Sequence, residues 1–255
     1  MATALITGGT SGIGAAFARA LAARGNDLVL VARNGDRLSE TATELKERYA
    51  IGVETIIADL AVRADVLGIA ERLTSVEQPI DMLINNAGFG VRAKLTDPDT
   101  TPHEHAIDVM IRAVLLLSAA AGRTMRQRGS GTIINVSSTA GFVAMGNYSA
   151  IKAWVTAYTE SLANELHGTG VNVTALCPGW VRTEFHERAK INVGSIPDLL
   201  WLDADQLVTD CLQDAAAGKV ISIPSKRYKI MIGIVERLPH RTLRAVSRRL
   251  RPGHH

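Results

Sequence analysis

The chain has 255 residues, of which 47% are hydrophobic, and a formal net charge of +3. That length predicts one α/β domain with a single core, and we expect no apolar run to reach the ~20 residues of a membrane-spanning helix. Cys177 and Cys211 lack metal-ligand spacing, so we predict no disulfide framework and a reducing, cytoplasmic compartment. The first residues show no basic segment followed by a long apolar run, so we expect no signal peptide.

The net charge is divided unevenly along the chain. From Lys226 to the C-terminus nine basic side chains stand against one acid, Glu236, whereas the preceding residues carry 19 basic and 24 acidic groups. The body is therefore mildly acidic and the tail is basic. This division excludes a nucleic-acid-binding surface that extends over the whole chain, and we expect no nucleic-acid partner.

Apolar runs of strand length alternate with longer stretches of helical pattern. Strands are expected over residues 3–7, 27–32, 53–58, 81–85, 132–136, 172–176 and 220–223. Helices are expected over residues 13–23, 36–49, 64–76, 102–128, 148–166 and 204–217. Continuous apolar strands separated by helices are typical of a parallel sheet covered on both faces. We predict a doubly wound α/β fold with about seven strands, in which residues 1–225 form one domain and residues 226–255 a C-terminal extension.

A glycine-rich segment joins the first expected strand to the first expected helix. Its glycines allow a tight turn and a close approach to a pyrophosphate, and the helix start offers backbone N–H groups to the phosphates. An ordinary glycine-rich turn is the alternative, but a strand before the segment and a helix after it favour a dinucleotide. The cofactor-binding residues predicted here are Gly8, Thr10, Ser11, Gly12, Ile13 and Gly14.

The end of the second expected strand should meet the adenosine ribose. NAD enzymes usually present an acid there to bind the 2′-hydroxyl, but this chain has Ala32 followed by Arg33. A guanidinium binds a 2′-phosphate in bidentate fashion, so we predict NADP rather than NAD, with a solvated arginine as the alternative. Asp59, after the third strand, either accepts a hydrogen bond from the adenine amine or caps the following helix.

Tyr148 and Lys152 lie four positions apart, on one face of the expected helix of residues 148–166. A free phenol loses its proton only near pH ~10, and an ammonium one turn away should lower that pKa by stabilising the phenolate. Such a phenol could exchange a proton with an alcohol or carbonyl oxygen. The spacing alone also arises by chance on solvated helices, so its meaning depends on the rest of the chain.

Taken in order, these segments resemble the short-chain dehydrogenases/reductases. The likeness extends roughly from Thr3 to Ile223, and the ordered set of motifs is far more specific than any one of them. It rests on the glycine-rich loop, Asn85-Asn86-Ala87-Gly88, Ser138, Tyr148-x-x-x-Lys152 and Pro178-Gly179. The resemblance implies a Rossmann-type fold with seven parallel strands and hydride transfer between NAD(P) and an alcohol or carbonyl. It also implies homodimers or homotetramers formed through the long central helices.

The resemblance further implies roles for individual residues. Tyr148 is the proton donor or acceptor, Lys152 lowers its pKa and binds the nicotinamide ribose, and Ser138 hydrogen-bonds the substrate oxygen. Two hydroxyl donors suit an oxygen that gains negative charge during reduction. By itself Ser138 would be read as a strand-end cap, and Ser137 is the weaker catalytic candidate. Tyr148 and Lys152 are also implied to contact the cofactor, together with Asn86, Ala87, Gly88, Pro178, Gly179, Val181 and Thr183.

Two features depart from the family pattern. Met110 stands where the family usually has an asparagine that helps to hold a water beside the lysine, and a thioether cannot replace that donor. If Met110 packs in the core, either the proton relay needs another route or the activity is low. In addition, ten positions separate Ser138 from Tyr148, about three fewer than is usual in the family, so the loop of residues 139–147 is short and reshapes one wall of the substrate pocket.

Residues 184–201 occupy the position of the family's variable substrate loop. Their apolar side chains favour a small apolar carbonyl or acyl substrate, although such residues more often only pack. These side chains are Phe185, Ile191, Val193, Ile196, Leu199, Leu200 and Trp201. We interpret His186 as a surface residue, and because His103 and His105 lack further metal-ligand partners we predict no metal site.

The basic tail alternates apolar residues with arginines, and Pro239 interrupts it. A basic amphipathic helix can lie on an anionic membrane, pack on a partner subunit, or attract the phosphates of an acyl carrier. The sequence leaves these three alternatives open.

Two hypotheses of different classes follow. The first is an NADP(H)-dependent oxidoreductase that interconverts a ketone or 3-oxoacyl group and a secondary alcohol, with Tyr148 as general acid/base. The second is a dinucleotide-binding protein without catalysis that serves as a sensor or scaffold. Met110 and the short loop keep the second hypothesis open, whereas the complete Ser138, Tyr148 and Lys152 set favours the first.

Overall fold

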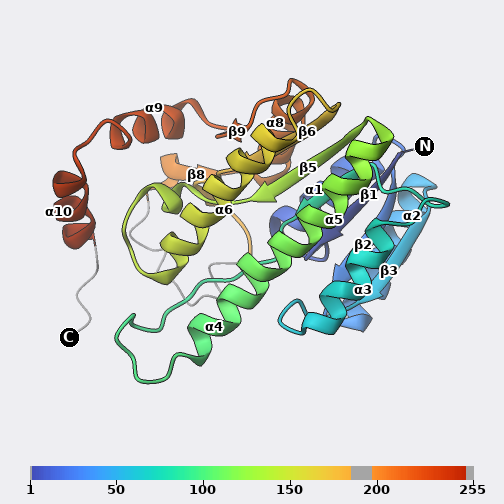
Figure 1. Ribbon diagram of the computed structural model, residues 1–255, viewed down its shortest axis with the longest axis horizontal. Coiled ribbons are helices and arrows are strands. Elements are labelled where there is room, and N and C mark those ends of the chain that lie inside the picture. Colours follow the sequence, from blue (N-terminus) through green and yellow to red (C-terminus); the bar gives the residue numbers. More distant parts are fainter. Residues whose placement is uncertain (1, 185–196, 251–255) are drawn as a thin grey trace.

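The computed structural model describes residues 2–184 and 197–250 (Figure 1). Its centre is a seven-stranded sheet in the order β3-β2-β1-β4-β5-β6-β9, in which every neighbouring pair is parallel. A second sheet consists of the short parallel pair β7 and β8. The strands are β1 (Thr3–Thr7), β2 (Asp27–Ala32), β3 (Val53–Ile57), β4 (Met82–Asn85), β5 (Gly131–Val136), β6 (Val171–Leu176), β7 (Trp180–Val181), β8 (Trp201–Leu202) and β9 (Ile221–Ser222).

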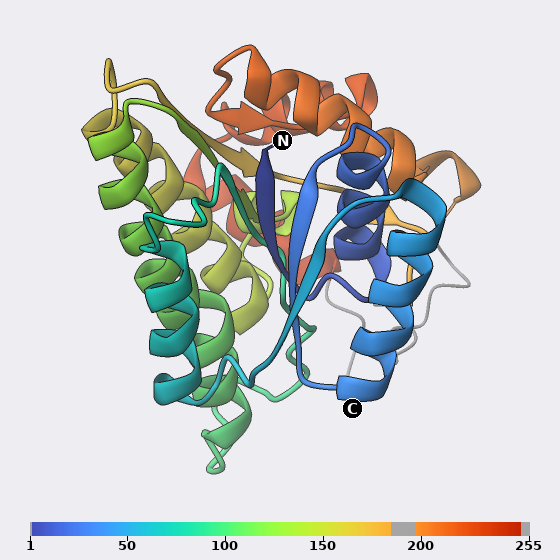
Figure 2. The same cartoon turned by 90° about the vertical axis from the view of Figure 1, so that its right-hand side faces the viewer.

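Helices cover both faces of the sheet (Figure 2). Helices α1, α2 and α8 cover one face of the sheet and share a hydrophobic cluster with it. Helices α3, α5 and α6 cover the other face and form a second cluster with it. The helices are α1 (Gly12–Ala22), α2 (Gly35–Tyr49), α3 (Arg63–Leu73), α4 (Thr101–Ile107), α5 (Ala113–Arg128), α6 (Asn147–Glu165), α8 (Ala204–Ala216), α9 (Lys226–Val235) and α10 (His240–Leu250), with the short turns η1 (Asp108–Arg112), η2 (Thr139–Phe142) and η3 (Asp198–Leu200). The predicted doubly wound α/β fold with seven parallel strands is therefore confirmed.

The central helix departs from its prediction in two ways. It is divided into α4, the π-helical turn η1 and α5, and η1 contains Met110. By length and composition alone, residues Thr101–Arg128 are long and apolar enough to span a membrane, which contradicts the expectation that no such run exists. About 56% of its most apolar window is buried inside the protein, as is usual for a helix that covers a sheet.

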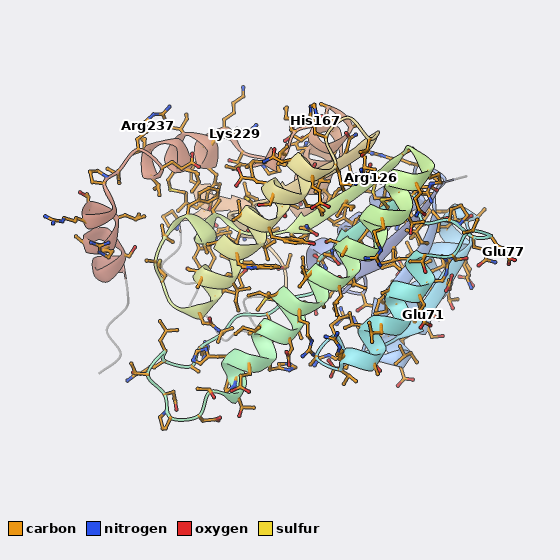
Figure 3. All side chains as sticks on the ribbon, viewed as in Figure 1. Glu71, Glu77, Arg126, His167, Lys229 and Arg237 are labelled. Atoms are coloured by element: carbon orange, nitrogen blue, oxygen red, sulfur yellow. The ribbon has the colours of Figure 1, made fainter. Side chains whose placement is uncertain are left out.

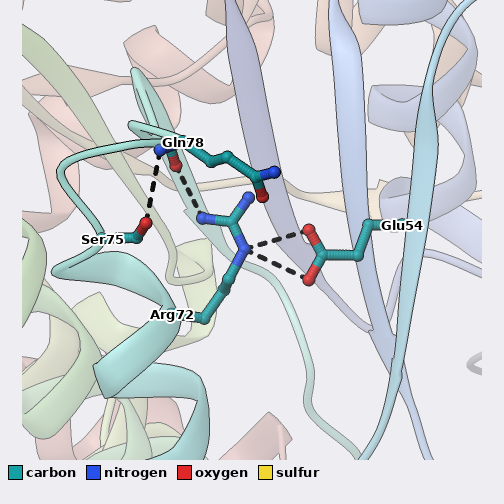
Figure 4. A network of polar contacts seen from close by, with 4 residues as sticks. All are labelled: Glu54, Arg72, Ser75 and Gln78. Atoms are coloured by element: carbon teal, nitrogen blue, oxygen red, sulfur yellow. Dashed lines mark hydrogen bonds and ion pairs between the residues drawn. The ribbon is translucent and has the colours of Figure 1, made fainter.

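The edge strand β3 is held by polar contacts to α3 (Figure 4). Arg72 Nε lies 3.0 Å and 3.1 Å from the two carboxylate oxygens of Glu54, and Arg72 Nη1 donates to the carbonyl of Gln78 at 2.7 Å. The backbone N–H of Gln78 donates in turn to Ser75 Oγ at 3.3 Å. A charged side chain on an exposed edge also discourages pairing with a strand of another molecule.

The C-terminal extension forms two helices, α9 and α10, on either side of the predicted interruption at Pro239 (Figure 1). Tyr228 and Ile232 of α9 are each 3% exposed and pack with Ala175, Cys177 and Ile223 of the body. The extension therefore shares a hydrophobic cluster with the sheet instead of trailing away from it.

Candidate active site

The predicted site segments converge where the strand order reverses. From β1 the sheet continues to β2 and β3 on one side and to β4, β5 and β6 on the other. In doubly wound folds a crevice opens at this point, beyond the carboxyl ends of the strands. The glycine-rich loop follows β1, Asn86 to Gly88 follow β4, and Ser138 lies just beyond β5.

The glycines of the first loop are required by its geometry. Gly8 and Gly12 have φ angles of +69° and +54°, a region that other residues rarely adopt. A Cβ on Gly14 would overlap the carbonyl oxygen of Gly8 and the side-chain amide of Asn86. Helix α1 begins directly after Ser11 with no side-chain cap and no acid in its first turn, so its N-terminus suits a phosphate group.

A hydrogen-bond network joins this loop to the end of β4. Asn86 Nδ2 donates to the carbonyls of Thr7 and Gly8 at 3.0 Å and 3.2 Å. Thr7 Oγ1 accepts from the backbone N–H groups of Asn86 and Ala87 at 3.0 Å and 3.1 Å. Deeper in the sheet, the buried Asn85 Nδ2 donates to Asn135 Oδ1 at 2.8 Å. These contacts hold the glycine-rich loop against the end of β4 and join β4 to β5.

Ser138, Tyr148 and Lys152 come together beyond β5. The Ser138 and Tyr148 hydroxyls are hydrogen-bonded, and Lys152 Nζ lies 5.6 Å from the centre of the Tyr148 ring. Lys152 is 4% exposed, and its Nζ donates to the carbonyl of Val136 at 2.8 Å. The structure thus gathers the three predicted catalytic side chains in one partly buried place.

The acid–base properties differ from those we predicted for the pair. Burial raises the pKa of Tyr148 to about 12, and its hydrogen bond with Ser138 opposes this rise only in part. Burial also lowers the pKa of Lys152 to about 8, against a smaller opposite effect from the neighbouring Cys177. The expected lowering of the Tyr148 pKa by Lys152 is therefore absent, because desolvation dominates over the charge of a buried lysine.

The short loop still brings the two hydroxyls together because it packs tightly on α6. A Cβ on Gly141 would lie 2.9 Å from the backbone nitrogen of Ala153, so only glycine allows this approach. Ser137, the weaker catalytic candidate, is 1% exposed, and its hydroxyl donates to the carbonyl of Lys152 at 2.7 Å. Ser137 thus anchors α6, whereas Ser138 lies beside Tyr148.

Met110 lies beside the lysine, as its place in the family pattern implies. It is 1% exposed, and a Cβ on Gly88 would lie 3.1 Å from Met110 Sδ and 3.7 Å from Lys152 Nζ. Met110 and Lys152 therefore both border Gly88, and the thioether can offer the ammonium only a weak acceptor. The carbonyl of Val136 is the acceptor that the lysine uses instead.

Two predicted cofactor contacts lie on the adenosine side of the cleft. Arg33 is exposed just after β2, and no hydrogen bond or ion pair joins it to the rest of the described chain. Asp59 Oδ1 accepts from the backbone N–H of Ala61 at 2.9 Å, and the first helical residue of α3 comes only at Arg63. Asp59 thus shapes the turn before α3 through its Oδ1 atom. Its Oδ2 atom accepts no hydrogen bond from the residues that the structure describes.

The segment after β6 reaches the glycine-rich loop. A Cβ on Gly12 would lie 3.3 Å from the Thr183 Cβ, so these residues are neighbours in space. The carbonyl of Pro178 accepts from Thr139 N at 2.9 Å and links this segment to the Ser138 loop. Val181 is 3% exposed and pairs with Leu202 in the short β7–β8 ladder. Phe185, His186, Ile191, Val193 and Ile196 lie outside the described residues.

Sequence reasoning missed a groove and an ion pair at the loop. Arg37 Nη2 lies 2.7 Å from Glu184 Oε1, and both side chains line a cavity of about 360 Å³ that also borders Thr10, Ser11 and Gly12. The cavity lies along the glycine-rich loop and not at Tyr148. The partners are 147 residues apart, and no local pattern predicts such a pair.

Sequence reasoning also missed Tyr228, a residue of the extension that contacts the described end of the substrate loop. Its hydroxyl accepts from the backbone N–H of Trp180 at 3.1 Å and donates to the carbonyl of Leu200 at 2.8 Å. Its ring fills the space that a Cβ on Gly179 would need. Tyr228 therefore holds together the two described ends of the substrate-loop region, next to the predicted nicotinamide segment.

We expect Tyr228→Phe to lower the free energy of unfolding by about 1–3 kcal/mol, because it leaves the Trp180 N–H and Leu200 C=O groups without their partner. Urea unfolding followed by circular dichroism measures this loss. Tyr49→Phe, at the distant end of α2, is the matched control and should change stability little. Equal stability of the two variants would show that the Tyr228 hydroxyl bonds contribute nothing.

Comparison with known proteins agrees with this geometry. The family model described as short chain dehydrogenase matches residues 2–193. A Streptomyces virginiae protein named as a ketoacyl reductase of monensin polyketide synthase is 39% identical over 195 residues, which cover 73% of each chain.

Solved structures extend the likeness to nearly the whole chain. A short-chain dehydrogenase from Sphingobium yanoikuyae in complex with NADPH has a TM-score of 0.84 and 33% identity, over 94% of this chain and 97% of that one. A bulky-bulky ketone specific alcohol dehydrogenase from Comamonas testosteroni has a TM-score of 0.79 and 29% identity, over 94% and 96%. The chain therefore belongs to the short-chain dehydrogenase/reductase family, oxidoreductases that act on CH–OH groups with NAD(P).

Proposed function

We propose that this protein is an NADP(H)-dependent reductase of ketones or 3-oxoacyl groups, with Tyr148 as the general acid in reduction and the general base in oxidation. The observation that carries the proposal is the hydrogen-bonded Ser138–Tyr148 pair, with the buried Lys152 beside it. A panel of ketones and alcohols, followed through the nicotinamide absorbance with NADPH and NADH, tests it.

Residues along the cleft could bind each part of a dinucleotide. Gly8 to Gly14 and the start of α1 would hold the pyrophosphate, Arg33 the 2′-phosphate, and Lys152 the nicotinamide ribose. The cofactor supplies the hydride. Asn86 would keep the loop against the sheet, so that the backbone amides stay aimed at the phosphates.

The hydroxyl pair performs the proton chemistry. As a carbonyl is reduced its oxygen gains negative charge, and Ser138 and Tyr148 both donate hydrogen bonds to it. A pKa of about 12 keeps the Tyr148 phenol protonated at neutral pH, which is the form that donates to a carbonyl. Lys152, whose ammonium lies 5.6 Å from the centre of the Tyr148 ring, would hold the phenol and the nicotinamide ribose in place.

The substrate class is proposed from the described part of the pocket and from the relatives. Trp180 and Trp201 lie with ring centres 6.1 Å apart, and Leu199 is 61% exposed. These apolar groups favour an apolar carbonyl or acyl substrate. The relatives named for a ketoacyl group and for bulky ketones support the same class.

We expect Arg33→Asp to shift cofactor preference toward NADH, by at least about tenfold in the ratio of kcat/KM values, because a carboxylate repels a 2′-phosphate and accepts a hydrogen bond from a 2′-hydroxyl. Steady-state kinetics with both cofactors measure the shift. Arg24→Asp, an exposed arginine after α1, is the control for the charge change. An unchanged preference would mean that the 2′-phosphate is bound elsewhere.

We also propose a cytoplasmic homodimer or homotetramer that pairs through the long helices α5 and α6. Leu115 on α5 is 42% exposed, and Trp154 and Tyr158 on α6 stack with ring centres 4.8 Å apart. Covering such apolar groups would stabilise an assembly. The alternative function, a dinucleotide-binding sensor or scaffold without turnover, gains support from Met110, which removes the usual amide beside Lys152.

A further inference from the structure

Helix α9 presents an apolar stripe to the outside of the molecule. Tyr228 and Ile232 face the body and are each 3% exposed. On the opposite side of the helix, Ile230 is 67% exposed and Ile234 is 58% exposed, with Met231 at 42% beside them. A soluble surface rarely gathers three such side chains on one short helix, so this face is suited to a partner.

Basic side chains surround this stripe. Lys226, Arg227, Lys229 and Arg237 are all exposed, and Glu236 is the acid among residues 226–237. Figure 3 shows Lys229 and Arg237 directed away from the body. Exposed Arg241 and Arg244 of α10 continue the positive charge. The outer face of the extension is therefore apolar along its middle and cationic around it.

The helix that carries this face is fixed in place without any partner. Ser225 Oγ accepts from the N–H of Tyr228 and caps α9, and the hydroxyl of Tyr228 binds Trp180 and Leu200. Ser247 of α10, 2% exposed, accepts from the N–H of Ala144 at 3.3 Å. Because the extension is already ordered, little conformational entropy is lost when its outer face binds.

Charge distinguishes the candidate occupants. A symmetric contact with a second copy centred on α9 would bring Lys226, Arg227 and Arg237 close to their own copies, which like-charge repulsion disfavours. Nucleic acid would satisfy the cations but leave the isoleucines in water. Anionic lipid satisfies both, because headgroups attract the cations while the isoleucines enter the acyl boundary.

We propose that α9, with the start of α10, docks the protein on an anionic lipid surface. The docking face adjoins the described end of the substrate loop: Arg227 Nη1 donates to the carbonyl of Leu199 at 2.8 Å, and Leu199 itself is exposed. The substrate class that follows is a long-chain ketone or 3-oxoacyl lipid taken from the membrane. The inference about the substrate class rests on the proposed reductase function, whereas the inference about docking does not.

Sedimentation with vesicles tests the docking without any substrate. Phosphatidylcholine vesicles that contain phosphatidylglycerol should bind the protein at least about tenfold better than pure phosphatidylcholine vesicles, and high salt should reduce this preference. The double variant Ile230→Asn/Ile234→Asn should lose at least about tenfold of the binding, because two apolar side chains no longer enter the acyl region. The double variant Lys226→Gln/Lys229→Gln should bind the vesicles that contain phosphatidylglycerol less well than the unaltered protein does. Its binding to pure phosphatidylcholine vesicles should not change.

Matched variants elsewhere on the surface are the controls. Leu67→Asn/Val76→Asn removes two exposed apolar side chains near α3, and Lys46→Gln/Arg48→Gln removes two exposed cations of α2. Both should bind vesicles as the unaltered protein does. Equal binding to both kinds of vesicle, or unchanged binding of the isoleucine variant, would overturn the proposal. A lower oligomer mass of that variant with unchanged vesicle binding would overturn it in favour of a subunit contact. Absence of ketone turnover would leave docking intact and would refute the substrate class together with the proposed reductase function on which it rests.

Discussion

Tyr148→Phe should lower kcat for ketone reduction by about 10²–10⁴-fold, because it keeps the ring and removes the proton that passes to the substrate oxygen. Ser138 would remain as a hydrogen-bond donor, which leaves a residual rate. NADPH affinity should change little, since the phosphate-binding loop lies on other elements. Steady-state kinetics and NADPH fluorescence titration measure the two effects separately.

Tyr158→Phe is the matched control for this change, because Tyr158 lies on the same helix and its hydroxyl donates to the carbonyl of Leu115 at 3.4 Å, away from Ser138. Its kcat should stay within a few-fold of the unaltered enzyme. If Tyr148→Phe retained the activity of the Tyr158→Phe control, the assignment of Tyr148 as general acid/base would fail.

Gly14→Ala should destabilise the protein by about 3 kcal/mol, at the upper end of the usual overpacking effect, and abolish NADPH binding. The added Cβ would overlap a backbone carbonyl, Gly8 C=O, and the Asn86 amide that holds the loop against β4. Backbone atoms cannot move aside as a flexible side chain can, so the loop itself must shift. Urea unfolding and NADPH titration measure the two losses.

Gly68→Ala is the matched control, because a Cβ there meets no heavy atom within 4 Å on the exposed face of α3. It should raise stability by about 0.4–1 kcal/mol through the lower entropy of the unfolded chain. Equal stability of the two alanine variants would show that the close approach at Gly14 is not needed.

The sheet was predictable because its strands are continuous apolar runs, a pattern that requires cover on both faces. Gly8, Gly12 and Gly14 were predictable for a related reason: a strand, a tight turn and a helix start each leave a local signature. The order of Ser138, Tyr148 and Lys152 then placed the catalytic set, and the structure brings these three side chains together.

What the sequence could not predict depends on contacts between distant residues. The Tyr228 hydroxyl joins Trp180 and Leu200 across a long interval of chain, and the Arg37–Glu184 pair does the same at the loop. The direction of the Tyr148 pKa shift was mispredicted because spacing on a helix carries no information on burial. The π-helical turn at Met110 likewise has no local signal that we could identify.

The central claim is that the cleft transfers hydride to a ketone and that Tyr148 supplies the proton. The most direct measurement is nicotinamide absorbance during incubation with a series of apolar ketones and 3-oxoacyl thioesters, alongside NADPH titration of the same preparation. We predict turnover with NADPH that exceeds turnover with NADH and is lost in Tyr148→Phe. Tight NADPH binding with no turnover on any of these carbonyls would contradict the claim and favour a sensor or scaffold.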